Sequence, residues 1–482
     1  MIKTISQFIK NIGFNMIADL SAKLSKSLLL ILISNALGVS SMGAFSIALT
    51  YIGFGILLSN WGFGNLLTRE VSRENSNYSI YLSNFIILRI TFAIIATIII
   101  NIVISFFSYN HETISVIRII SLSLIATTII KLIYSLFIAF EDLKPISIVF
   151  FITSTIRLLI SLVVVFLGGT IIQISVYYTI VEYLTMILCG IITIKRLSNF
   201  QFHFDYKFAL SQISIAFPFF WIGISAMLDT RVEILILSFY FNEAIVGYYT
   251  AVNTILGGVT LFSEAIRNAV FPIVTRYQKD SSVILKKTVH LLGKYILLIT
   301  VPISILIFFF ADEIIFFLFR DNFHISVTML RITIWIFIFY SYSVVLSNLL
   351  MAHNKERVLA LFLLFSGLLT VLLNLLVAPI IGVIGIAIVR LITSVIMFVL
   401  PLYFHKKETG YGIVSLSTVL RILLCGFAMF IIIHFLSPYN LWFSSLLAVI
   451  IYIVGLFILK VTLLDDISLL KKVMSNLVKR DT

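Results

Sequence analysis

Charged residues are scarce in this chain. Aspartate, glutamate, lysine and arginine make up 11% of its 482 residues, whereas 61% are hydrophobic and the mean hydropathy is +1.14. A soluble domain carries about 25% charged and about 45–50% apolar residues. The composition therefore excludes a soluble globular protein. The apolar runs are continuous and do not alternate with polar residues, so helices are favoured over strands. We predict an all-α polytopic membrane protein.

Cysteine pairs and metal-ligand patterns are also lacking. The two cysteines, Cys189 and Cys425, lie in apolar stretches far apart in the sequence. That arrangement favours small core residues over a disulfide framework. The seven histidines are scattered without ligand spacing. We expect neither a metal site nor a cofactor.

The chain lacks the motifs of ATP-driven pumps and of membrane enzymes. Gly293-Lys294 is followed by Tyr295, and no glycine stands at the earlier position that a phosphate-cradling loop requires. A membrane polymerase, ligase or glycosyltransferase usually carries a sizeable outer loop with catalytic acids, whereas the loops predicted on the outer side are short. We therefore expect that the protein is not an enzyme.

Apolar runs long enough to cross a bilayer are abundant. A transmembrane helix needs about 20 apolar residues, and we predict roughly fourteen such helices. Their residue ranges are 12–35, 42–66, 80–107, 113–139, 145–167, 170–194, 211–239, 244–272, 288–310, 324–350, 357–379, 381–403, 413–436 and 441–463.

The net charge of +13 is unevenly distributed. In a soluble protein this excess would suggest a nucleic-acid partner, but here the basic residues fall mostly in short loops on one predicted side. These basic residues are expected to set the topology and to place both termini in the cytoplasm. The membrane that holds the protein is expected to be the inner (cytoplasmic) membrane of the cell. We expect no nucleic acid. Residues 2–12 and 464–482 are predicted to be amphipathic segments on the inner leaflet.

Two similar motifs suggest an internal repeat. The run Gly43-Ala44-Phe45-Ser46-Ile47-Ala48 opens the second predicted span, and Gly247-Tyr248-Tyr249-Thr250-Ala251-Val252 opens the eighth. A six-span unit that occurs twice would place its second copy at the seventh span, as observed. The predicted parts are an N-terminal six-helix bundle at 1–194, a cytoplasmic linker at 195–210, a second bundle at 211–403, two additional helices at 413–463 and a tail at 464–482.

These and other segments resemble one known family. The similar segments are 43–48, Asn60-Trp61-Gly62-Phe63-Gly64, Arg69-Glu70, Asp229 with 246–249, and Gly382-Val383-Ile384-Gly385. They look like polysaccharide transporters, the O-antigen and capsular-polysaccharide flippases of the multidrug/oligosaccharidyl-lipid/polysaccharide (MOP) superfamily. The resemblance covers nearly the whole chain.

The resemblance implies two six-helix bundles around a central cavity that opens alternately to each side of the membrane, with two further helices. It implies a flippase that moves an oligosaccharide on polyprenyl pyrophosphate from the inner to the outer leaflet. Membrane lipids and polysaccharide polymerase or assembly proteins are the implied partners. The internal repeat agrees with a transporter, because many transporters are built from two structural repeats. A peptidoglycan lipid-precursor flippase and a MATE-type drug/cation antiporter remain alternatives.

Cations within the predicted spans are the strongest functional signal. A cation near the bilayer centre costs about 2.5–3.5 kcal/mol on insertion scales. Lys26, Arg89, Arg157 and Arg390 each lie well inside an apolar run and have no acid within four residues. They are predicted to face a shared cavity and to bind an anionic substrate, because arginine offers a planar fork for phosphate oxygens. The other cations are expected to pair, to reach the membrane surface, or to lie outside the bundles: Lys23, Arg118, Lys131, Arg331 and Arg421.

Three carboxylates within the spans are candidates for ion coupling. Asp229 and Glu233 are four residues apart and share a helix face, whereas Arg231 points elsewhere. Two neighbouring carboxylates favour proton uptake. Glu182 stands alone near the middle of its span. Glu264 and Arg267 are three residues apart and are expected to form a structural ion pair.

Overall fold

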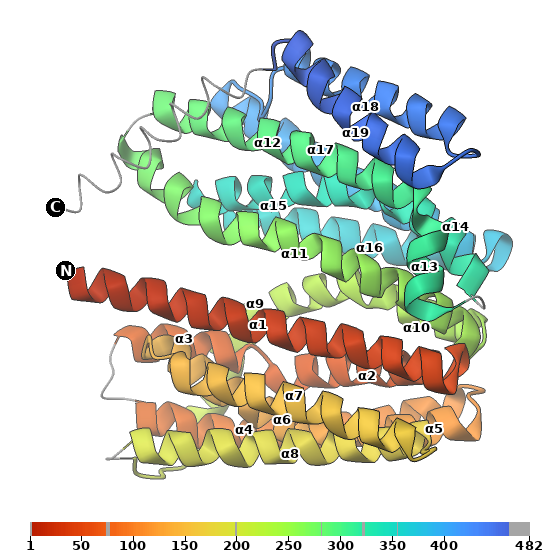
Figure 1. Cartoon of the computed structure of the whole chain (residues 1–482). Coiled ribbons are helices and arrows are strands. Elements are labelled where there is room, and N and C mark those ends of the chain that lie inside the picture. The colour runs from red at the N-terminus through yellow and green to blue at the C-terminus, as the bar shows by residue number, and fades with distance from the viewer. Residues whose placement is uncertain are drawn as a thin grey trace. The chain divides into compact units, whose positions relative to one another are not determined.

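The computed structural model is helical along most of its described length (Figure 1). It describes residues 2–73, 78–197, 200–280, 282–320, 323–353 and 355–461. Within these ranges, the side chains of residues 2–19, 229–230, 268–280 and 282–284 are not described. The predicted tail at 464–482 lies outside the described residues.

The helices follow one another with short connections. In chain order they are α1 (Ile2–Leu37), α2 (Val39–Asn60), α3 (Phe63–Arg73), α4 (Tyr78–Val103), η2 (Ile104–Phe106), α5 (His111–Ser121), α6 (Ser123–Ala139), α7 (Lys144–Phe166), α8 (Ile171–Arg196), α9 (Tyr206–Thr230), α10 (Val232–Tyr240), α11 (Glu243–Asp280), α12 (Ser282–Phe309), α13 (Ala311–Phe319), α14 (His324–Thr333), α15 (Ile336–Ala352), α16 (Glu356–Ile381), α17 (Val383–Thr409), α18 (Leu416–Leu436) and α19 (Leu441–Ile458).

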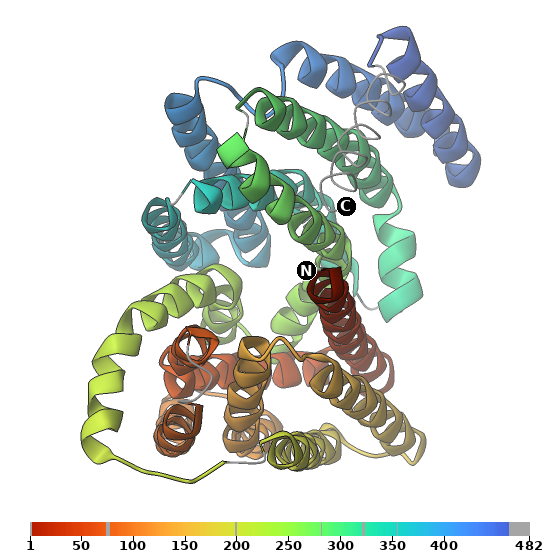
Figure 2. The ribbon, with the colours of Figure 1, turned by 90° about the vertical axis from the view of Figure 1, so that its left-hand side faces the viewer.

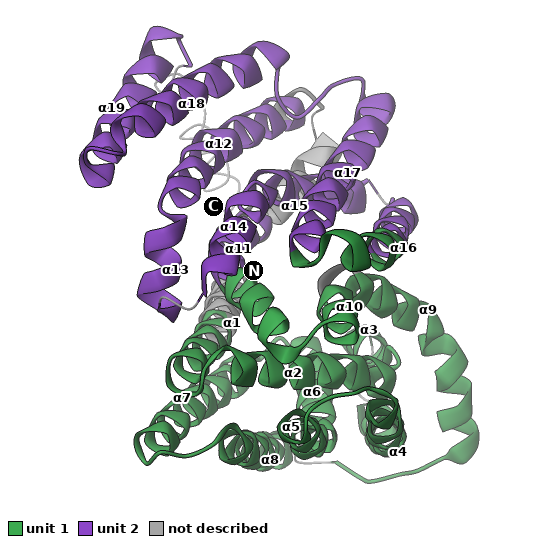
Figure 3. Cartoon of the chain, turned by 90° about the vertical axis from the view of Figure 1, so that its right-hand side faces the viewer, with its two compact units in different colours: residues 1–254, 371–383 green, residues 255–370, 384–482 purple. Residues whose placement is uncertain are grey.

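The predicted fold class is confirmed. Thirteen helical segments of the described chain are long and apolar enough to cross a membrane, and the bent pair α14–α15 brings the number to fourteen. The segment predicted as a separate amphipathic helix at 2–12 is instead the beginning of the unbroken α1. The chain forms two compact units (Figure 3). Unit 1 holds residues 1–254 and 371–383, and unit 2 holds residues 255–370 and 384–482.

Three spans of unit 1 are interrupted, and the fourth span of the chain breaks at Leu122, between α5 and α6. The second span breaks between α2 and α3, where Trp61 and Gly62 have φ angles of 43° and 84°. Gly62 is required there, because a Cβ atom would lie 2.6 Å from the Ala216 carbonyl oxygen. The seventh span breaks between α9 and α10 at Arg231. Helix α9 also curves along its length (Figure 2, yellow-green) and contains Pro218, which removes a helical hydrogen bond.

The two repeated glycine motifs pack against each other inside unit 1. A Cβ atom on Gly43 would collide with the carbonyl oxygen of Glu243, and one on Gly247 would collide with the carbonyl oxygen of Val39. Glycine at both positions therefore lets the backbones of α2 and α11 approach closely, as small residues do at membrane helix crossings.

Polar side chains near this crossing join the loop after η2 to α2 and α10. The Tyr109 hydroxyl is 3.2 Å from the Tyr51 hydroxyl and 2.8 Å from that of Ser238. Glu243 accepts hydrogen bonds from the Asn110 amide at 3.3 Å and from the Thr113 hydroxyl at 3.0 Å. Tyr109 lies outside the spans, and burial raises its pKa, with the nearby Glu243 charge acting in the same direction. These bonds hold one end of unit 1 together.

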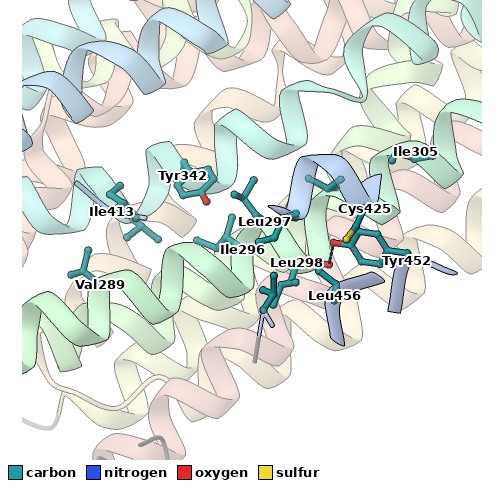
Figure 4. Close-up of a cluster of buried hydrophobic side chains, with 14 of the residues drawn as sticks. Val289, Ile296, Leu297, Leu298, Ile305, Tyr342, Ile413, Cys425, Tyr452 and Leu456 are labelled. Carbon is teal, nitrogen blue, oxygen red and sulfur yellow. Dashed lines mark hydrogen bonds between the residues drawn. The ribbon is translucent and has the colours of Figure 1, made fainter. Parts of the chain in front are cut away.

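Unit 2 has an apolar core that docks the two last helices (Figure 4). Leu298 of α12, Cys425 of α18 and Leu456 of α19 belong to this one cluster of buried side chains. The Tyr452 hydroxyl donates to the Leu298 carbonyl oxygen at 3.2 Å and so ties α19 to α12. Both cysteines of the chain are free and buried, as the sequence predicted.

Candidate functional site

Four cationic side chains of unit 1 come from four different elements. They are Lys26 of α1, Lys131 of α6, Arg157 of α7 and Arg231 between α9 and α10. We call them the cationic cluster. Helix α1 packs along α7, and both α6 and α7 pack along α8, so residues far apart in the sequence become neighbours. Arg231 interacts electrostatically with both Lys26 and Lys131.

Arg157 and Glu182 form an ion pair within this region. The Nη2 atom of Arg157 lies 2.6 Å from Oε1 of Glu182, and its guanidinium lies 4.5 Å from the centroid of the Tyr178 ring. The Thr127 hydroxyl donates to the other Glu182 oxygen at 3.4 Å. The sequence identified Arg157 and Glu182 as separate candidates, because their helices α7 and α8 come together only through tertiary packing.

Arg231 is a member of the cluster that the sequence analysis passed over. It interrupts the seventh span with backbone angles of −130° and −20°, and the N-terminus of α10 follows directly. A helix N-terminus carries a partial positive charge, which adds to that of the guanidinium. Arg231 also interacts electrostatically with Tyr178. Its position inside the predicted span 211–239 is the signal that could have found it, although Asp229 and Glu233 stand two residues away on either side.

The two lysines of the cluster are exposed. The sequence predicted that Lys131 would extend to the membrane surface. The structure places it within electrostatic range of Arg89 and Glu182, as well as of Arg231. An exposed ammonium at membrane depth is tolerated where it faces water or an anion and not lipid. Lys26 and Lys131 are thus the cluster members most available to a ligand.

The cluster carries an excess of positive charge. Its four cations and the carboxylate of Glu182 give a formal charge of +3 among the described side chains. Such an excess inside a membrane protein is stabilised by a polyanion, because a phosphate group accepts charge-assisted hydrogen bonds from several cations at once. The arrangement can therefore bind an anionic group, and the two guanidinium groups can each engage phosphate oxygens through two N–H donors.

Arg89 is buried within unit 1. It is 1% exposed, donates to the Thr128 carbonyl oxygen at 2.6 Å and also donates to the side-chain oxygen of Asn60. Asn60 ends α2, next to the break at Trp61, and also accepts from the Gly64 amide at 3.2 Å. Arg89 therefore ties α4 to α6 and to the break between α2 and α3. Its predicted contact with a ligand stays a prediction.

The remaining acidic candidates differ in their surroundings. Glu233 is 2% exposed and accepts a hydrogen bond from the Tyr249 hydroxyl at 2.6 Å. The side chain of Asp229 lies outside the described residues. Among the three predicted coupling residues, Glu182 is the one that the structure places in contact with the cationic cluster.

Unit 2 contains several of the other cations that the sequence singled out. Arg390 lies half-buried on α17, and its carbonyl oxygen accepts from the Thr393 hydroxyl at 3.2 Å. Glu264 pairs with Arg267 at 3.0 Å, as predicted, and also accepts from the Tyr340 hydroxyl at 2.7 Å. The other two cations also have contacts: Arg331 pairs with Asp312, and Arg421 donates to the Leu459 carbonyl oxygen at 3.0 Å, near the end of α19.

Comparison with known proteins identifies a family and a fold. A family model described as "Polysaccharide biosynthesis protein" matches residues 8–278. No curated protein matches the chain significantly in sequence.

Solved structures share the fold. The lipid II flippase MurJ, in an inward closed conformation, has a TM-score of 0.78 and 18% identity, with 93% of this chain and 98% of that chain covered. An inward-facing multidrug resistance MATE family transporter of the MOP superfamily has a TM-score of 0.65 and 12% identity, with 81% and 94% covered. The Vibrio cholerae MATE transporter VcmN has a TM-score of 0.57 and 13% identity, with 84% and 96% covered.

Proposed function

The chain belongs to the family of polysaccharide biosynthesis proteins, and we propose that it is a flippase for an oligosaccharide linked to polyprenyl pyrophosphate. Its fold is that of the MOP superfamily, and the solved structures reported above are a flippase and multidrug transporters, not enzymes. The substrate would be an O-antigen, capsule or related repeat unit. It would move from the inner to the outer leaflet of the cytoplasmic membrane by alternating access.

The observation that carries this proposal is the net positive charge of the cationic cluster. A pyrophosphate diester carries a negative charge on each phosphate, and its oxygens match the donors of Arg157 and Arg231. The exposed ammonium groups of Lys26 and Lys131 add attraction without a fixed geometry. The pyrophosphate is common to all lipid-linked repeat units of this kind, so one cluster would serve whatever sugar is attached.

Several features of the proposal come from the sequence. They are the two six-helix bundles at 1–194 and 211–403, the cytoplasmic position of both termini, and coupling to an ion gradient. Arg390 would supply a further cation from the predicted second bundle, whose bounds also include Arg231. Polysaccharide polymerase or assembly proteins would receive the flipped product.

Substitutions in the cluster test the proposal in a cell that depends on this protein for its surface polysaccharide. We expect Lys131→Ala and Arg231→Ala each to reduce surface polysaccharide at least tenfold, since each removes a cation from the cluster. Arg118→Ala is the matched control, because Arg118 is an exposed arginine on α5 outside the cluster, and it should retain full activity. Full polysaccharide in both cluster variants, at normal protein levels, would overturn the proposal.

A peptidoglycan lipid-precursor flippase is the second candidate, and the TM-score of 0.78 with MurJ favours it. Such a protein would move the same kind of lipid pyrophosphate, so the cluster does not separate the two. Rescue of a strain lacking its own lipid II flippase would support this alternative. A MATE-type antiporter of cationic drugs is disfavoured, because a cationic cluster repels such a substrate.

A further inference from the structure

Unit 1 contains a cavity that shares no residue with the cationic cluster. Its volume is about 510 Å³, and it lies where α3, α6 and α8 end and α4 begins (Figure 1). Helix α6 packs along the other three helices, which brings these ends together. Tyr78, Phe140, Glu141 and Arg196 are among the residues that line the cavity. They come from separate elements, so the cavity is a product of the folded unit.

The cavity lies at the level where lipid headgroups meet the protein. Three apolar spans, Tyr78–Phe106, His111–Ala139 and Ile171–Arg196, each begin or end at a residue that lines it. Two exposed apolar side chains, Ile138 and Ile194, stand just inside these ends in the sequence. A molecule whose polar part fills the cavity can therefore extend apolar chains along the lipid-facing surface of the spans.

The lining offers one group of each charge. The carboxylate of Glu141 and the guanidinium of Arg196 both belong to exposed side chains. The Nη2 atom of Arg196 lies 3.0 Å from Oδ2 of Asp142, and this ion pair holds the guanidinium beside the cavity. A guanidinium carries five N–H donors, so the pair leaves donors for an anion. A ligand with one cationic and one anionic group therefore fits the charges of the lining.

Three features of the lining favour an ammonium as the cationic group. The C-terminus of a helix carries a partial negative charge, and the C-termini of α3, α6 and α8 outnumber the one N-terminus at the cavity, that of α4. The rings of Tyr78 and Phe140 meet edge to face with their centroids 5.8 Å apart, and an aromatic face attracts a cation. The carboxylate of Glu141 accepts charge-assisted hydrogen bonds from the N–H groups of a primary ammonium.

We propose that this cavity binds the headgroup of phosphatidylethanolamine, in the inner leaflet by the predicted topology. The primary ammonium donates to the Glu141 carboxylate and lies against the rings of Tyr78 and Phe140, and the phosphate accepts from Arg196. Phosphatidylcholine lacks ammonium N–H donors, and phosphatidylglycerol lacks a cation, so neither makes all of these contacts. The bound lipid would join the ends of α4, α6 and α8. The inference does not depend on the proposed function.

Native mass spectrometry of the purified full chain in detergent tests the site, with the three lipids added separately and with identical acyl chains. We expect the wild type to bind its first phosphatidylethanolamine at least about tenfold more tightly than either other lipid, because both lack the charge-assisted hydrogen bonds of the ammonium. Glu141→Gln keeps the size of the side chain and removes its charge, and it should bring the three affinities to within about twofold of one another. Arg196→Gln should weaken the binding of all three lipids, since each carries the phosphate.

Glu112→Gln is the matched control, because Glu112 is an exposed carboxylate in the first turn of α5, at the other end of the span His111–Ala139, and it should bind the lipids as the wild type does. Equal affinities of the wild type for the three lipids would overturn the proposal, and this comparison needs no variant to fold. An undiminished preference in Glu141→Gln would also overturn it. Phosphoethanolamine, the soluble headgroup, should not displace the lipid at equal concentration. Displacement would assign the cavity to a soluble molecule and overturn the lipid site.

Discussion

Gly43 of α2 and Gly247 of α11 pack against each other, and a Cβ atom on Gly43 would lie 3.0 Å from the Gly247 amide nitrogen. These two glycines begin the motifs that the sequence pairs as equivalent positions of a repeat. Both glycines are thus needed at one helix crossing. Gly43 makes room for the backbone of α11, and Gly247 makes room for the backbone of α2.

A methyl group at this crossing should destabilise the protein. For Gly43→Ala and Gly247→Ala we expect a loss of about 1–3 kcal/mol, as for other overpacked sites, because the obstacles are backbone atoms that cannot rotate away. Thermal unfolding in detergent measures the effect. Gly257→Ala, on the same helix α11 but with no atom within 4 Å of the added Cβ, should unfold at or above the wild-type temperature. Equal unfolding temperatures for all three variants would contradict the crossing.

Arg89→Ala should act on folding and not on binding alone. The substitution removes the Arg89 donor from the buried Thr128 carbonyl oxygen and one of the two donors to Asn60, which keeps the Gly64 amide, at about 1–3 kcal/mol for the buried carbonyl group. We expect a lower unfolding temperature and less protein in the membrane. Lys131→Ala is the comparison, because its side chain is exposed and its loss should leave the unfolding temperature unchanged. If Arg89→Ala unfolds like the wild type and fails only in transport, Arg89 contacts the substrate after all.

The hydroxyl contacts of Tyr109 should depend on pH in a defined direction. Burial raises the pKa of Tyr109, so the folded protein holds this proton more tightly than the unfolded chain. The resulting stability is fully present below the unfolded pKa of about 10 and is lost as the pH rises through the folded pKa. Tyr109→Phe should cost about 0.5–1.5 kcal/mol at neutral pH. The stability difference between Tyr109→Phe and the wild type, followed by their unfolding temperatures, should shrink as the pH rises from about 9 to about 11. A difference that grew instead would contradict this role.

Much of the fold follows from the sequence, because a helix that crosses a membrane is a local property of about 20 residues. The breaks at Trp61 and at Arg231 do not follow in the same way. The first involves a neighbouring element, because Ala216 closes on Gly62 there, and the second brings Arg231 within electrostatic range of Lys26.

The candidate site was only partly predictable for a related reason. The depth of Lys26 and Arg157 in apolar runs identified them, since that depth is visible in one helix at a time. Depth does not show which way a side chain faces. Arg89 proved to be enclosed by its own hydrogen bonds, and Lys131 proved to belong to the cluster. The partnership of Arg157 with Glu182 needed two helices to meet.

Translocation in proteoliposomes tests the central claim most directly. The purified chain is reconstituted with a fluorescent oligosaccharide on polyprenyl pyrophosphate, and a membrane-impermeant quencher reports its passage between leaflets. We expect rapid passage with the wild type and none with the double variant Lys131→Gln and Arg231→Gln, whose unfolding temperature should be unchanged. A matched lipid without the pyrophosphate should not be moved. Equal passage of the two lipids, or full passage by the double variant, would contradict recognition of the pyrophosphate by the cationic cluster.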